Sequence, residues 1–127
     1  MNVKIKFQQS ELMDFQNIVT LMYNINREFL NYIEFYNVSS LLKKVSDCNF
    51  KNNFNNKLSY NITFNPNECE CFLKLVEHSS NLLDQSPYHK AIVIEKCTNI
   101  HKIISNLEHQ KNVFVSNQSF DIPKKLN

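Results

Sequence analysis

The sequence predicts an α+β fold that is mostly helical, with a small antiparallel sheet of two or three strands. Three observations lead to this prediction. Apolar residues recur at alternating spacings of three and four over long stretches, which is the pattern of amphipathic helices. Two short segments instead alternate apolar and polar residues, as half-buried strands do. A chain of 127 residues, 43% hydrophobic and 20% charged, is expected to fold as a single compact domain over residues 1–127.

Residues 3–7 and the stretch after them predict a first strand followed by a long N-terminal helix. Val3, Ile5 and Phe7 alternate with lysines, which places one face of the strand against the core. From Ser10, the expected N-cap, apolar residues recur at helical spacing as far as Asn37. A helix of that length would be roughly 40 Å long, which exceeds what one face of a small domain needs. We therefore expect it either to project toward a partner or to break close to residue 25.

The second half of this helical pattern is rich in aromatic residues, namely Phe29, Tyr32, Phe35 and Tyr36. Side chains at these four positions cannot share one narrow stripe of a helix. Two interpretations stay open: the rings belong to the core, or some of them form an exposed contact patch. We take all four as candidate partner-binding residues.

Residues 38–45 predict a short second helix, and residues 46–57 predict a flexible loop. The helix rests on four apolar residues at helical spacing. The loop contains five asparagines and is more typical of turns than of regular structure. Phe50 and Phe54 lie within it and either pack back onto the core or anchor a partner. Both therefore join the candidate binding residues.

Residues 58–64 alternate again and predict a second strand, after which two helices follow. Asn65 as N-cap, Pro66 at the first helical position and Glu68 three residues after the cap form a capping-box arrangement. A similar start recurs at Ser86, which is followed by a proline. The two helices are expected to form an antiparallel C-terminal hairpin joined by a short turn.

Three segments near the C-terminus carry less regular patterns. Residues 91–94 are β-branched enough to form a buried strand, although the rhythm around them favours a helix. Residues 113–115 are expected to form a third short strand. The last segment, residues 121–127, is expected to be a loose tail.

The chain contains no glycine and a single arginine. Without glycine, a phosphate-binding loop, a dinucleotide-binding turn and a nucleophile elbow are all excluded. Positions with positive φ must then be filled by asparagine or aspartate. The surplus of Asn, Lys, Ile, Phe and Tyr matches A/T-rich codons and suggests an AT-rich bacterium, phage, virus or parasite as the source.

The charge balance argues against a dedicated nucleic-acid-binding protein. The net charge is +2 and the isoelectric point about 8.3, and one arginine leaves few groups for reading bases. The alternative is a small nucleic-acid-binding regulator that uses the C-terminal helix pair, where Lys90, Lys96, His101 and Lys102 lie. No export signal and no apolar run long enough to span a membrane is present. We therefore expect a cytoplasmic protein without a membrane partner, whose four cysteines are reduced.

Cysteines and histidines give one specific site hypothesis, a metal centre. Cys97 and His101 are four residues apart on a predicted helix, and Cys71 on the neighbouring predicted helix could approach them. A structural zinc needs a fourth ligand, which the spacing does not supply. We therefore predict that no metal or cofactor is bound. No activated cysteine or working carboxylate pair is indicated either, so the chain is not expected to be an enzyme.

These exclusions leave a non-catalytic protein-protein interaction module as the expected function. Small size, AT-rich coding and the lack of catalytic motifs are the profile of accessory proteins of phages and other mobile elements. Such proteins often bind and inhibit a host factor, for example a defence nuclease, so the expected partner is a protein. A homo-oligomeric structural subunit is a further alternative, with dimerisation through the long N-terminal helix as its natural form.

Overall fold

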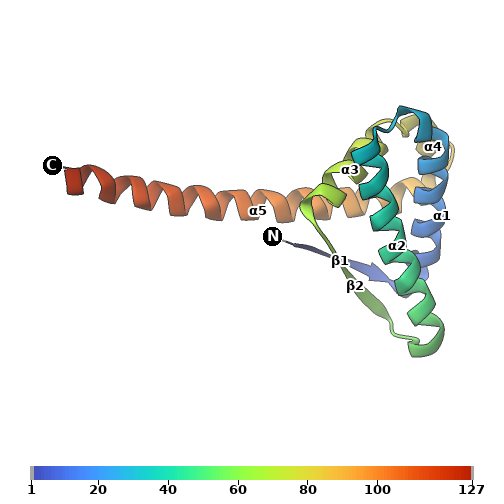
Figure 1. The fold of residues 1–127 in the computed structure, drawn as a ribbon. Coiled ribbons are helices and arrows are strands. Elements are labelled where there is room, and N and C mark those ends of the chain that lie inside the picture. Colours follow the sequence, from blue (N-terminus) through green and yellow to red (C-terminus); the bar gives the residue numbers. More distant parts are fainter. Residues whose placement is uncertain (1, 127) are drawn as a thin grey trace.

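A computed structural model describes the backbone of residues 2–126 and the side chains of residues 2–110. The predicted fold class is confirmed: the chain is mostly helical, with a two-stranded antiparallel sheet. In Figure 1 the helices pack on one side of the sheet, and the C-terminal half of α5 extends away from all other elements. The elements in chain order are β1 (Val3–Gln8), α1 (Gln9–Asn26), the short 3-10 helix η1 (Arg27–Phe29), α2 (Tyr32–Asn55), β2 (Ser59–Phe64), α3 (Pro66–Glu77), α4 (Ser80–Asp84) and α5 (Pro87–Leu126).

The sheet separates an apolar inner face from a polar outer face, as the alternation predicts. Val3 pairs with Phe64, and the register continues to Gln8 opposite Ser59. The inner residues of β1 are buried, while every second residue is exposed. The Phe7 ring meets Phe15 of α1 edge to face, with 4.8 Å between ring centroids. Rings from the sheet and from α1 therefore lie at the centre of one continuous core.

The long N-terminal helix breaks, and α1 ends at Asn26. The buried Asn26 amide donates to the Met22 carbonyl at 2.9 Å and to the Ser79 hydroxyl at 3.0 Å. That side chain fixes the end of α1 against the segment after α3, and η1 then turns the chain. The next helix begins at an Asn31 N-cap, whose side chain accepts from the Glu34 backbone N–H while the Glu34 carboxylate accepts from the Asn31 N–H.

The prediction of a short helix over residues 38–45 and a flexible loop over residues 46–57 is wrong. Both segments belong to α2, which runs to Asn55. Asn49 is buried, and its amide donates to the Leu12 carbonyl at 3.2 Å and to the Gln16 side chain at 2.5 Å. These tertiary hydrogen bonds outweigh the low helix propensity of asparagine. Within the described backbone Asn56 has positive φ, 48°, which confirms that asparagine takes the left-handed positions of this chain.

The C-terminal region contains more helix than expected. The capping box at Asn65 is confirmed, but α3 ends at Glu77 and α4 is a separate short helix. Residues 91–94 are helical, and the predictions of a strand at residues 113–115 and a loose tail from residue 121 are wrong, because α5 continues through Leu126. Only the last residue of that predicted tail lies outside the described residues.

Two lysines bind the two outer edges of the sheet. Gln9 N–H donates to the Leu58 carbonyl, so Gln9 and Leu58 form a hydrogen-bonded pair. Hydrogen-bonded and non-hydrogen-bonded pairs alternate along an antiparallel ladder, so Lys6 with Asn61 and Lys4 with Thr63 are non-hydrogen-bonded pairs. The carbonyls of Lys6 and Thr63 therefore point away from the partner strand. Lys96 of α5 donates to the Lys6 carbonyl at 3.0 Å. Lys44 of α2 donates to the Thr63 carbonyl at 3.2 Å. The sheet is therefore held between two helices by side-chain hydrogen bonds to its edges.

Each of these lysines also pairs with a shielded glutamate. The Lys96 amino group, 1% exposed, lies 3.0 Å from the Glu11 carboxylate and 4.8 Å from the centre of the Phe7 ring. Lys44 lies 2.6 Å from Glu68, which is fully buried and also accepts from the Ser40 hydroxyl. Buried charges are stable only when paired and hydrogen-bonded in this way, so both networks fix the geometry of the fold.

Replacing Lys96 by alanine is expected to lower the free energy of unfolding by about 3 to 5 kcal/mol, because it removes one partner of a shielded ion pair and a bond to β1. Urea unfolding measures the change. Lys102→Ala, at an exposed site on the same helix, is the matched control and should change stability by less than about 0.5 kcal/mol. Equal effects of the two substitutions would contradict a special role for Lys96.

Glu68 is expected to make stability fall in acid. Burial raises the pKa of Glu68, but hydrogen bonds from Lys44, Ser40 and the Asn65 backbone outweigh it and hold the pKa below its ordinary value of 4.5. A lowered folded-state pKa stabilises the protein above the ordinary value, and this stability is lost as pH falls through the folded-state pKa. Glu68→Gln should cost about 1 to 3 kcal/mol at neutral pH and much less in acid. Unfolding series at several pH values test this, and a pH profile with unchanged slope would refute it.

Candidate functional site

Large apolar side chains are exposed at the two opposite ends of α2. The junction cluster, at the turn between α1 and α2, consists of Ile25, Phe29, Tyr32, Ile33 and Tyr36, which are 55% to 86% exposed. The tip cluster, at the C-terminal end of α2 and in the turn after it, consists of Phe50, Phe54 and Leu58, which are 66% to 85% exposed. About 33 Å of helix separates Tyr32 from Phe54. The six aromatic residues predicted to bind a partner therefore do not form one surface.

Phe35 differs from the other predicted aromatic residues because it is half-buried. Its ring packs on Tyr23 with 5.4 Å between centroids, and the Arg27 guanidinium lies 5.5 Å from its centre. The Tyr23 hydroxyl in turn lies 3.2 Å from the Ser39 hydroxyl. Phe35 thus joins α1 to α2 beside the junction cluster, whereas the other five predicted aromatic residues are exposed.

The support of the junction cluster is rigid and carries charges of both signs at its rim. The Ser79 hydroxyl accepts from Asn26 and donates to the Leu75 carbonyl at 2.7 Å, which anchors the end of α1 to α3. Glu34 forms an ion pair with Lys74, and this hydrogen bond holds the pKa of Glu34 below its ordinary value. Arg27 and Glu28 are exposed beside Phe29. The cluster is therefore an ordered apolar surface within a mixed-charge border.

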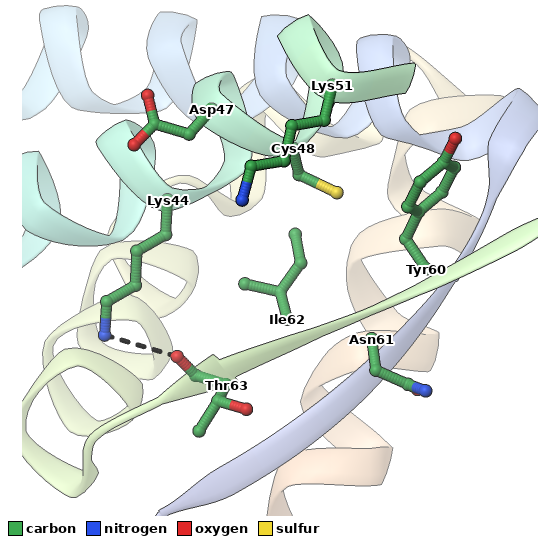
Figure 2. A pocket seen from close by; sticks show the side chains of 8 residues that line it. All are labelled: Lys44, Asp47, Cys48, Lys51, Tyr60, Asn61, Ile62 and Thr63. Carbon is green, nitrogen blue, oxygen red and sulfur yellow. Dashed lines mark hydrogen bonds between the residues drawn. The ribbon is translucent and has the colours of Figure 1, made fainter. Parts of the chain in front are cut away.

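A pocket of about 380 Å³ lies between α2 and β2 (Figure 2). Its lining combines two lysine amino groups, one carboxylate, one thiol and the polar side chains of β2 around an apolar residue; these residues are Lys44, Asp47, Cys48, Lys51, Tyr60, Asn61, Ile62 and Thr63. Burial raises the pKa of the Cys48 thiol, although the charge of Lys51 acts against this. Burial thus disfavours the reactive thiolate form of Cys48 at neutral pH.

The candidate metal ligands are not brought together. Cys97 and His101 line a groove between α3 and α5, whereas Cys71 lines a different pocket beside Glu34 and Asn37. Over residues 2–110, no group of three or more His, Cys, Asp or Glu side chains is placed to hold a metal ion. The two faces of α3 explain the separation, because Cys71 lies on the side of α3 that faces α2.

The four residues that the nucleic-acid alternative would use on the C-terminal helix pair differ in their surroundings. Lys96 is buried against β1, and Lys90 pairs with Asp84 at 2.6 Å. His101 and Lys102 are exposed, but they are only two of the four expected residues. Sequence reasoning could not identify Lys96 as buried, because the groups that bind it come from the other end of the chain.

The described helices include none that is long and apolar enough to cross a membrane. Comparison with models of known protein families, with curated proteins and with solved structures found no match to this chain.

The thiols are expected to fall into two classes when a thiol-specific reagent is added at about pH 8. Burial raises the pKa of Cys69 and of Cys97 to about 11, so both should react only as the protein unfolds. Cys48 and Cys71 are half-buried and should react first in the folded protein. Mass spectrometry of peptides over time identifies the modified residues. Equal reaction rates at all four sites would contradict the described burial.

Proposed function

We propose that this chain is a non-catalytic protein-interaction module that binds its partner through the junction cluster. The observation that supports it is the exposure of Phe29, Tyr32 and Tyr36, at 78%, 86% and 68%, together with two isoleucines from the same turn. Large apolar side chains that are exposed within one turn of the chain often mark a surface that binds a partner.

The size and rigidity of the junction cluster fit a protein interface. Its three aromatic and two aliphatic side chains expose roughly 700 Å², close to the ~800 Å² that each partner buries in a standard interface. Exposed tyrosine and other aromatic side chains supply much of the binding energy at such surfaces. Because Asn26, Ser79 and the Asn31 capping box already order the turn, little backbone conformational entropy remains to be lost on binding.

The narrower assignment, an accessory protein of a phage or other mobile element that inhibits a host factor, rests on composition. The AT-rich residue usage and the absence of glycine support it. A host protein such as a defence nuclease is the partner that this assignment proposes, with a cytoplasmic location as part of the proposal. Self-association is the alternative, and it is favoured by the neighbouring Arg27 and Glu28, which can pair across a two-fold axis.

Substitution of both Phe29 and Tyr32 by serine is expected to abolish partner capture, because it removes two exposed anchors of the interface. A loss of about 30-fold or more in affinity is expected for residues that each contribute at hot-spot level. Quantitative affinity purification from the native host, with tagged wild type and variant, measures the effect.

The matched control is Phe50→Ser with Phe54→Ser, which removes two exposed rings from the tip cluster and should retain the same partner. Light scattering over a concentration series shows whether that partner is a second copy of the chain. Retention of all partners by the Phe29 and Tyr32 variant would refute the junction cluster as the interface.

A further inference from the structure

The positive charge of the chain is concentrated in two segments, residues 1–10 and 48–67. These segments contain Lys4, Lys6, Lys51 and Lys57 and no aspartate or glutamate, so they carry four positive charges. The whole chain has a net charge of +2, so the other 97 residues, with ten basic and twelve acidic side chains, carry two negative charges. The charge is therefore distributed unevenly along the chain, which the moderate isoelectric point does not reveal.

The fold pairs the strands of the two segments, so their outward residues lie on one face of the sheet. The outward residues of the sheet face each other in three pairs: Lys4 with Thr63, Lys6 with Asn61, and Gln8 with Ser59. All six side chains can donate a hydrogen bond, and none is acidic or apolar. Among the described residues, no carboxylate lies within ion-pair distance of Lys4 or Lys6. The outer face of the sheet is thus a donor-rich, basic surface.

The pocket of Figure 2 continues this surface toward the tip cluster. Figure 2 shows the Lys51 amino group turned toward the space between α2 and β2, with Asn61 and Thr63 along its lower border. Next to Lys51 on α2, the Phe50 and Phe54 rings meet edge to face with 5.2 Å between centroids. Cations, amides and exposed aromatic rings therefore follow one another from the sheet to the end of α2.

We infer that this basic face, made of the outer side of the sheet, the pocket and the tip cluster, binds single-stranded nucleic acid. Lysines contact the phosphates, and unstacked bases stack on Phe50 and Phe54, which is how single strands are held without sequence-specific readout. Base pairs in a duplex are already stacked and would leave these rings unused. An anionic lipid surface fits less well, because the face also carries amides and hydroxyls that would lose their water.

Two features of the chain agree with this ligand. A single arginine argues against readout of duplex base pairs, but stacking and phosphate contacts by lysine need no arginine. Asp47 is the one carboxylate in the pocket lining. It can accept a hydrogen bond from the exocyclic amino group of a base, so the pocket offers Lys51 to a phosphate and Asp47 to the edge of the adjoining base.

Fluorescence anisotropy with a labelled oligonucleotide of about 16 nucleotides tests the inference on the full chain. The probe is offered as single-stranded DNA, single-stranded RNA and a DNA duplex, so that the arms separate the possible sources of phosphate. If all four lysines contact phosphates, affinity for the single strand should fall about 50-fold between about 50 and 200 mM salt. The duplex should bind more weakly than either single strand.

Paired substitutions identify the surface. Lys4→Gln with Lys6→Gln should weaken binding at low salt and reduce the salt effect to about sevenfold, because two phosphate contacts are lost. Lys90→Gln with Lys102→Gln changes the net charge equally, lies outside the basic face and should leave binding unchanged. Phe50→Ser with Phe54→Ser should weaken binding at least about fivefold while leaving the salt effect intact. Circular dichroism melting curves verify that each variant is folded.

Three outcomes would overturn the inference. One is no anisotropy change up to about 100 μM protein, the weak limit of non-specific binding. Another is an equal loss of affinity in the control pair, which would show a general charge effect. The third is binding that polyglutamate displaces as readily as unlabelled oligonucleotide, with no effect of the aromatic substitutions, which would point to an acidic protein as the ligand.

Discussion

The arrangement of the helices depends on the side chains that hydrogen-bond to backbone carbonyls at the two edges of the small sheet. Two strands alone form a marginal structure, and each has an outer edge with unpaired backbone groups. In this protein Lys96 from α5 binds one edge and Lys44 from α2 binds the other. Each lysine is in turn neutralised by a shielded glutamate, Glu11 or Glu68. Helices from different parts of the chain are thereby fixed to the sheet, and Phe7 and Phe15 pack in the space they enclose.

Because α2 is fixed along the sheet, it separates two surfaces with different chemistry. Its N-terminal end carries the junction cluster, which is apolar with a mixed-charge rim, and its C-terminal end carries the tip cluster beside the basic face. Under the two proposals made above, the first surface binds a protein and the second a single-stranded nucleic acid, about one helix length apart. A chain with both activities would act as an adaptor between the two.

Much of this fold could be predicted from the sequence, and the failures have identifiable physical causes. Alternation located both strands, and the capping pattern at Asn65 located the start of α3, because these signals are local. The helix through Asn49 was missed because hydrogen bonds to Leu12 and Gln16, more than 30 residues away, stabilise it. The sequence also indicated the aromatic residues at the start of α2, but the exposure of Phe29 and Tyr32 follows from the turn at Asn26, which tertiary contacts fix. The uneven charge distribution can be read from the sequence, but the net charge of the whole chain does not show it.

The lysines at the sheet edges also bear on how the protein behaves at high concentration. A chain that exposes several aromatic side chains would ordinarily be at risk of pairing its strands with those of a neighbour and growing into cross-β fibrils. To join either edge, an incoming strand would have to displace an ammonium group from a backbone carbonyl and leave Glu11 or Glu68 without its counter-charge. The same contacts that hold the helices in place therefore oppose the addition of a strand at Lys6 and at Thr63.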